Sequence, residues 1–160
     1  MDRQDDTRTE RGSIERELYI DASPEIVFAV VSDPEHVREW WPDEAHYEVV
    51  VGSAGEIMFG SPDGGVVEAL TVVDVQPPTR FAFRWTHPAG EGADEGNSLL
   101  VTFELTPQGD GTLLRFVESG YRERGWEAAV LEATYLDHVE GWDHFLPRLV
   151  AYAASVGARS

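Results

Sequence analysis

The chain has 160 residues, no cysteine and a formal net charge of −18 at pH 7, and all 12 of its basic residues are arginines. This length is typical of one domain with one core, and the lack of cysteine excludes disulfides, a thiolate nucleophile and a zinc-thiolate site. An acidic surface repels phosphate groups and anionic lipids, so we expect neither nucleic acid nor a membrane as a partner. Arginine-favouring coding bias and adaptation to high salt both explain the composition.

The N-terminal residues 1–13 are polar and mix both signs of charge, which predicts a disordered tail. They contain no apolar stretch of the kind found in signal peptides, and no apolar run in the chain approaches the ~20 residues of a membrane span. We therefore predict a cytoplasmic protein with a single folded domain over residues 14–156.

Residues 14–20 predict the first strand, because Ile14, Leu18 and Ile20 share one face. Arg16 is the polar exception on that face.

Two short helices are predicted next. Ser23 is a favourable N-cap and Pro24 suits the first helical position. An Asp-Pro pair at residues 33–34 repeats this start signal. The second helix is expected to end just before Pro42, because the residue preceding a proline is pushed away from helical geometry.

Six further strands follow, separated by turns rich in Gly, Pro, Asp and Ser. The clearest pattern runs from Arg80 to Trp85, where three aromatic residues point one way and two arginines the other, so one face is buried and one is wet. The expected strands cover residues 46–51, 55–60, 65–75, 79–86, 97–106 and 112–119.

A long amphipathic helix is predicted over residues 131–153, and its start is left open between residues 120 and 129. Its apolar residues recur at intervals of three and four, as one helical face requires. Gly141 and Pro147 oppose a regular helix, and Pro147 predicts a bend. The expected fold class is α+β, with a curved antiparallel sheet of about six to seven strands wrapped around this C-terminal helix. The apolar face of this helix consists of Leu131, Tyr135, Val139, Trp142, Leu146, Leu149 and Ala153.

Four sequence stretches, at residues 20–28, 37–42, 73–85 and 140–149, carry a resemblance to a known superfamily. They read IDASPEIVF, VREWWP, VDVQPPTRF followed by Trp85, and EGWDHFLPRL. The chain resembles the START-like (SRPBCC) superfamily, which includes the birch pollen allergen, over residues 14–154. Its motifs are most similar to the branch named after the activator of the ninety-kilodalton heat-shock chaperone's ATPase.

The resemblance implies a helix-grip fold with a cavity between the sheet and the C-terminal helix. In relatives such a cavity accepts lipids, sterols, polyketides or other apolar and aromatic molecules, which makes binding of a small hydrophobic ligand the leading hypothesis. A chaperone-activating or other protein-interaction module is the first alternative. An enzyme of the polyketide cyclase or hydrolase kind is the second, because a minority of relatives are enzymes.

Aromatic residues of the inner face either line this cavity or fill a closed core, and the pattern does not distinguish the two. Tyr121 and Tyr135 either contribute hydroxyls at the pocket rim or are only residues at the boundary of the core. The candidate aromatic ligand-binding residues are Trp41, Phe59, Phe83, Trp85, Phe103, Phe116, Tyr121, Tyr135, Trp142 and Phe145.

Glu118 and His138 are the candidate polar residues of the cavity. Strand alternation from Leu114 and Phe116 directs Glu118 inward, where it would bond a ligand hydroxyl, or else meet water or an arginine. His138 lies one helical turn before Trp142, so it is either a hydrogen-bond donor or general base in the cavity, or a residue at the edge of the core. The enzyme hypothesis uses these two side chains as acid and base.

No catalytic residue, cofactor or metal site is assigned from the sequence. His144 and Glu140 are four residues apart, a spacing that can bind metal, but no third ligand is evident. The serines do not occur in a nucleophile-elbow pattern, and no glycine-rich phosphate loop is present.

Overall fold

The structure, a computed structural model, describes residues 12–60, 65–88 and 90–159. Seven strands form one antiparallel sheet in the order β1-β7-β6-β5-β4-β3-β2. In chain order the elements are β1 (Ser13–Ile20), α2 (Pro24–Ser32), α3 (Pro34–Trp40), β2 (Glu44–His46), β3 (Ala54–Phe59), β4 (Val66–Gln76), β5 (Arg80–Trp85), β6 (Leu99–Gln108), β7 (Gly111–Ser119), the 3-10 helix η1 (Arg122–Arg124) and α4 (Ala128–Arg159).

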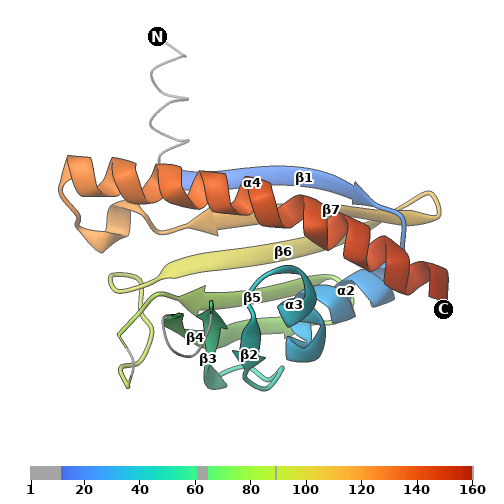
Figure 1. Cartoon of the computed structure of the whole chain (residues 1–160), viewed down its shortest axis with the longest axis horizontal. Helices are drawn as coiled ribbons and strands as arrows, with labels where there is room; N and C mark the ends of the chain where they lie inside the picture. The colour runs from blue at the N-terminus through green and yellow to red at the C-terminus, as the bar shows by residue number, and fades with distance from the viewer. Residues whose placement is uncertain (1–11, 61–64, 89, 160) are drawn as a thin grey trace, which may run out of the picture.

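Helix α4 extends along the sheet, and α2 and α3 lie beside its C-terminal half (Figure 1). The three helices contact one another, and α2 also packs against strands β5, β6 and β7. The core therefore lies between the helices and one face of the curved sheet. This arrangement confirms the predicted α+β helix-grip fold.

The predicted helix starts are confirmed by their caps. The Ser23 hydroxyl accepts a hydrogen bond from the backbone N–H of Ile26 at 3.3 Å. The Asp33 carboxylate accepts one from the backbone N–H of Glu35 at 2.9 Å. Each cap satisfies a backbone donor that has no partner inside the helix, so the chain enters both helices at the expected residues.

The inner face of the sheet follows the predicted alternation. Phe81, Phe83 and Trp85 of β5 are buried, while Arg80 on the same strand is half-buried and pairs with acidic neighbours. The polar residue among the apolar positions of β1 also has a partner, at the exposed edge of the contact with α4. Arg16 lies 2.9 Å from Asp143 of α4, so an ion pair links the first strand to the last helix.

One predicted strand is wrong: residues 46–51 are not a strand, and β2 ends at His46. The Tyr47 hydroxyl donates to the carbonyl oxygen of Ser32 at 2.7 Å, which turns the chain toward α2. The following loop closes through a hydrogen bond from the Glu48 N–H to the Ser53 hydroxyl at 3.0 Å. The other strands begin and end within two residues of their predicted positions.

The final helix is longer than the predicted 131–153, because it begins at Ala128 and ends at Arg159. The segment before it contains η1, and the residue that caps its C-terminal end, Gly125, has a left-handed φ of 74°. Helix α4 continues through Pro147 as one element.

The predicted tail, residues 1–13, falls mainly on residues 1–11, which lie outside the described residues; Ser13 already belongs to β1. In the part of the chain that the structure describes, no helix combines the length and the hydropathy needed to cross a membrane.

Gly55 is expected to be essential for the packing of β2 against β3. A Cβ at this position would overlap the carbonyl oxygen of His46 and approach the Tyr47 side chain to 2.7 Å. Because backbone cannot give way as a flexible side chain does, Gly55→Ala is expected to lower the free energy of unfolding by about 1–3 kcal/mol. Urea unfolding measures the change. Gly92→Ala is the control, since its Cβ meets nothing within 4 Å, and equal stability of the two variants would contradict the prediction.

Candidate functional site

Glu118 is a fully buried acidic residue at the end of β7. It pairs with Ile14 of β1 on one side and Val101 of β6 on the other, so the sheet surrounds it with apolar neighbours. The inward direction follows from the alternation of β7, as predicted. A carboxylate removed from water requires hydrogen-bond donors close by, because its burial is otherwise costly.

Four side chains direct polar atoms at the Glu118 carboxylate. The indole nitrogens of Trp85 and Trp142 donate to it over 2.8 and 3.0 Å. His138 Nδ1 lies 2.9 Å from Oε1, and the Tyr121 hydroxyl donates to the same oxygen. Glu118 is therefore shielded from solvent, and among the described residues it contacts no arginine, so neither alternative that the sequence left open is seen there.

Three separate parts of the chain bring these donors together. Trp85 is the last residue of β5, two strands away from β7 in the sheet. Gly120, with a φ of 107° that favours glycine, turns the chain so that Tyr121 folds back beneath Glu118. His138 and Trp142 are four residues apart on α4 and therefore share the face that covers the sheet.

The protonation of His138 follows from its partner. An indole N–H can only donate, and one indole bonds each carboxylate oxygen of Glu118, so both oxygens act as acceptors. An ionised Glu118 can only accept, and Nδ1 of His138 then carries the hydrogen of the 2.9 Å bond. Burial alone would lower the pKa of His138, but the hydrogen bond and negative charge of Glu118, with smaller contributions from Asp137 and Glu68, raise it above the ordinary value.

This raised pKa predicts a pH-dependent contribution to stability. It is fully present below about pH 6.5, the ordinary histidine pKa, and is lost as the pH rises through the raised pKa of the folded state. The stability deficit of His138→Gln should therefore be larger at about pH 5.5 than at about pH 9.5. Urea unfolding at both pH values checks this, with His144→Gln of the same helix as the control. A stability deficit that does not change with pH would show that the charge of His138 adds nothing to the free energy of unfolding.

A small pocket of about 120 Å³ lies between α4 and the sheet, next to Glu118 and the four side chains that contact its carboxylate. Five aromatic side chains and His138 form most of its wall, and the side chain of His138 is 15 % exposed. The ring of Trp41 ties the wall together, lying 5.0 Å from the ring of Trp85 and 4.9 Å from that of Trp142. The lining residues are Trp41, Phe59, Trp85, Asp137, His138, Gly141, Trp142 and Phe145.

The pocket brings together six of the twelve predicted ligand-binding residues. Phe83, Phe103 and Phe116 lie in the closed core and do not line it. Tyr121 bonds Glu118, and the Tyr135 hydroxyl donates to the Ser13 carbonyl oxygen at 3.0 Å, so neither hydroxyl lies at the pocket rim.

Two lining residues, Asp137 and Gly141, were missed from the sequence. From the sequence, Gly141 is only a residue that opposes a regular helix. Its spacing carried the signal, because it lies three residues after His138 and four before Phe145, on the same helical face.

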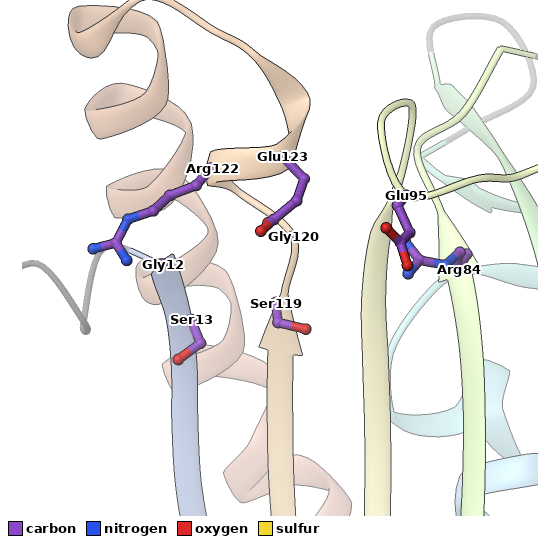
Figure 2. A pocket seen from close by; sticks show the side chains of 8 residues that line it. All are labelled: Gly12, Ser13, Arg84, Glu95, Ser119, Gly120, Arg122 and Glu123. Carbon is purple, nitrogen blue, oxygen red and sulfur yellow. The ribbon is translucent and has the colours of Figure 1, made fainter.

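A larger hollow of about 400 Å³ lies where β1 begins and β7 ends (Figure 2). Its charged side chains come from two arginines, Arg84 and Arg122, and two glutamates, Glu95 and Glu123. Two further hollows, of about 650 and 570 Å³, lie over β3 and β4 and between α3 and β2. None of the three hollows is lined by Glu118, by His138 or by the aromatic side chains of the small pocket. The small pocket therefore remains the best match to an apolar ligand.

The predicted lack of a metal site remains a prediction. Within residues 12–60, 65–88 and 90–159, no group of three or more His, Asp or Glu side chains is placed to hold a metal ion. His144 stacks edge-on against Phe145, with ring centroids 4.8 Å apart.

Known proteins resemble this chain both in sequence, through a family model, and in fold, through solved structures. The family model described as "Activator of Hsp90 ATPase homolog 1-like protein" matches residues 21–154. A search of curated proteins found no match.

Among solved structures, protein MLL2253 from Mesorhizobium loti is 26% identical with a TM-score of 0.70, over 88% of this chain and 95% of that one. CalU16 from Micromonospora echinospora is 20% identical with a TM-score of 0.64, over 88% and 65%. DynU16, from the dynemicin biosynthetic locus, is 24% identical with a TM-score of 0.63, over 88% and 46%. The chain therefore belongs to the family of activator of Hsp90 ATPase homolog 1-like proteins, and with it to the START-like (SRPBCC) superfamily that its four motifs resemble.

Proposed function

We propose that this protein binds a small hydrophobic molecule in the pocket between α4 and the sheet. The observation that carries the proposal is the wall of the pocket, where aromatic side chains surround one histidine that a buried carboxylate holds in place. Apolar lining with one or two precisely placed polar groups is the usual composition of a small-molecule site. Membership of the START-like superfamily supports the same assignment.

The size of the pocket narrows the ligand class. Ligand pockets usually measure about 300–1,000 Å³, and an apolar cavity of about 150 Å³ accommodates benzene. With about 120 Å³, the pocket encloses roughly one ring. Of the classes that the superfamily resemblance implies, an aromatic molecule or one ring of a polyketide therefore fits better than a sterol or a lipid chain.

Binding of toluene, naphthalene, cholesterol and oleic acid tests the proposal. Isothermal titration calorimetry should show saturable binding of an aromatic probe, and Phe145→Ala should weaken it because Phe145 lines the pocket. Tyr19→Ala is the control, since Tyr19 is 47% exposed on β1. If no probe binds, or if Phe145→Ala keeps the affinity of the wild type, the proposed site is wrong.

Acid–base catalysis is a second candidate, favoured by the 2.9 Å contact between His138 and Glu118. A carboxylate that bonds one ring nitrogen of histidine orients the ring and stabilises its charged form, which suits the other nitrogen for proton transfer. In such a reaction Glu118 would act through His138, because its own oxygens are bonded to four protein groups. The alternative of a chaperone activator rests on the family description alone.

A further inference from the structure

We infer, building on the proposed function, that the ligand of this pocket presents an oxygen acceptor, such as a ketone carbonyl, to His138 and enters past Gly141. The inference concerns the chemistry of the ligand and its route, and it rests on two independent observations about α4.

The first observation is the free ring nitrogen of His138. Nδ1 is committed to Glu118, and within the described part of the chain Nε2 has no hydrogen-bond partner. His138 also lines the pocket, so Nε2 is the polar atom that this ring offers to a ligand. With the hydrogen of the Glu118 bond on Nδ1, Nε2 donates when the ring is charged and accepts when the ring is neutral.

The charges around His138 favour the charged ring. Glu118 of β7, Asp137 of α4 and Glu68 of β4 all raise the pKa of His138, against the opposing effect of burial. Tyr121 shares the Glu118 oxygen and donates to it. Burial raises the pKa of Glu68, so this third carboxyl is also sensitive to its apolar surroundings. Below this raised pKa the ring is charged and Nε2 is a donor, so the group that complements it is an acceptor.

The second observation is the glycine in the middle of α4. A glycine inside a helix costs about 0.5–1 kcal/mol relative to alanine, so it usually has a packing reason. Gly157 has one, since a Cβ there would come within 3.1 Å of the Ala22 side chain. At Gly141 an added Cβ would meet nothing within 4 Å, yet the residue lines the pocket. The missing side chain thus leaves an opening next to His138.

Acetophenone and α-methylstyrene test the first part, because they have the same shape and differ only in a carbonyl oxygen replaced by a methylene group. At about pH 5.5 we expect acetophenone to bind at least about tenfold more tightly, as a charge-assisted hydrogen bond allows. At about pH 9.5 the preference should fall, because neutral Nε2 is an acceptor. His138→Phe should remove the preference while α-methylstyrene still binds. Equal affinities of the two probes for the wild type, or a preference that survives in His138→Phe, would overturn the inference.

Gly141→Leu tests the entry route. The leucine side chain would occupy the opening, so the affinity for both probes should fall at least about tenfold, while the folded helix is retained because leucine favours helix. Glu140→Leu, at the exposed neighbouring position, should bind as the wild type does. Unchanged affinity in Gly141→Leu would rule out this route. If neither these two probes nor toluene, naphthalene, cholesterol or oleic acid binds the wild type, the proposed function itself fails. If only those four bind, or if both probes bind equally, the acceptor chemistry inferred here is contradicted and the proposed function is not.

Discussion

Replacing Glu118 by alanine is expected to lower the free energy of unfolding by about 3–5 kcal/mol, the range for breaking a buried charged pair. The substitution removes the shared acceptor of two indole nitrogens, one tyrosine hydroxyl and His138. Each buried donor left without a partner costs about 1–3 kcal/mol, although water that enters the space recovers part of it. Chemical unfolding at pH 7 measures the loss.

Two further variants distinguish the loss of the buried hydrogen-bond acceptor from the loss of a negative charge elsewhere on the protein. Glu118→Gln keeps the shape but presents an N–H₂ group to donors, so we expect an intermediate loss of about 1–3 kcal/mol. Glu17→Ala removes an exposed carboxylate of β1 whose nearest arginine contact is 4.0 Å, and should change stability by less than about 1 kcal/mol. A Glu118→Ala variant as stable as Glu17→Ala would show that the hydrogen bonds accepted by Glu118 do not stabilise the fold.

Trp142→Ala is expected to destabilise the fold by about 3–5 kcal/mol, as is usual for a large aromatic residue removed from a core. The Trp142 ring is 2% exposed, and its centroid lies 4.6 Å from that of Phe116 and 4.9 Å from that of Trp41. It therefore joins α4 to β7 and to the end of α3. The loss of this ring should lower the midpoint of thermal and urea unfolding together.

Trp142→Phe distinguishes the packing of Trp142 from its hydrogen bond. Phenylalanine keeps an aromatic ring but removes the donor to Glu118, so a loss of about 1.5–3 kcal/mol is expected, smaller than that of the alanine variant. Leu136→Ala is the matched control on α4, since Leu136 is 56% exposed and should contribute little. If Trp142→Phe and Trp142→Ala cost the same, the ring contributes no packing energy of its own.

The aromatic pocket shows where prediction from sequence ends. Strand alternation correctly directs Phe83, Phe116 and Trp85 inward, but direction alone does not separate a residue of the closed core from one at a cavity wall. That difference depends on how closely α4 approaches the sheet. The strand predicted at residues 46–51 differs from the observed β2 for a related reason. The hydrogen bond of Tyr47 to Ser32 joins two segments that local propensity treats as independent.

Residue patterns were enough to predict the fold class, the helix caps at Ser23 and Asp33, the inward direction of Glu118 and the apolar face of the last helix. These features follow from periodicity and capping, which are local in the chain. The surroundings of Glu118 became visible only in the folded chain, since Trp85 and Trp142 come from segments far apart in sequence and meet only when α4 covers the sheet. The tertiary structure also decided the volume of the pocket and the opening at Gly141, because empty space is set by the packing of several elements at once.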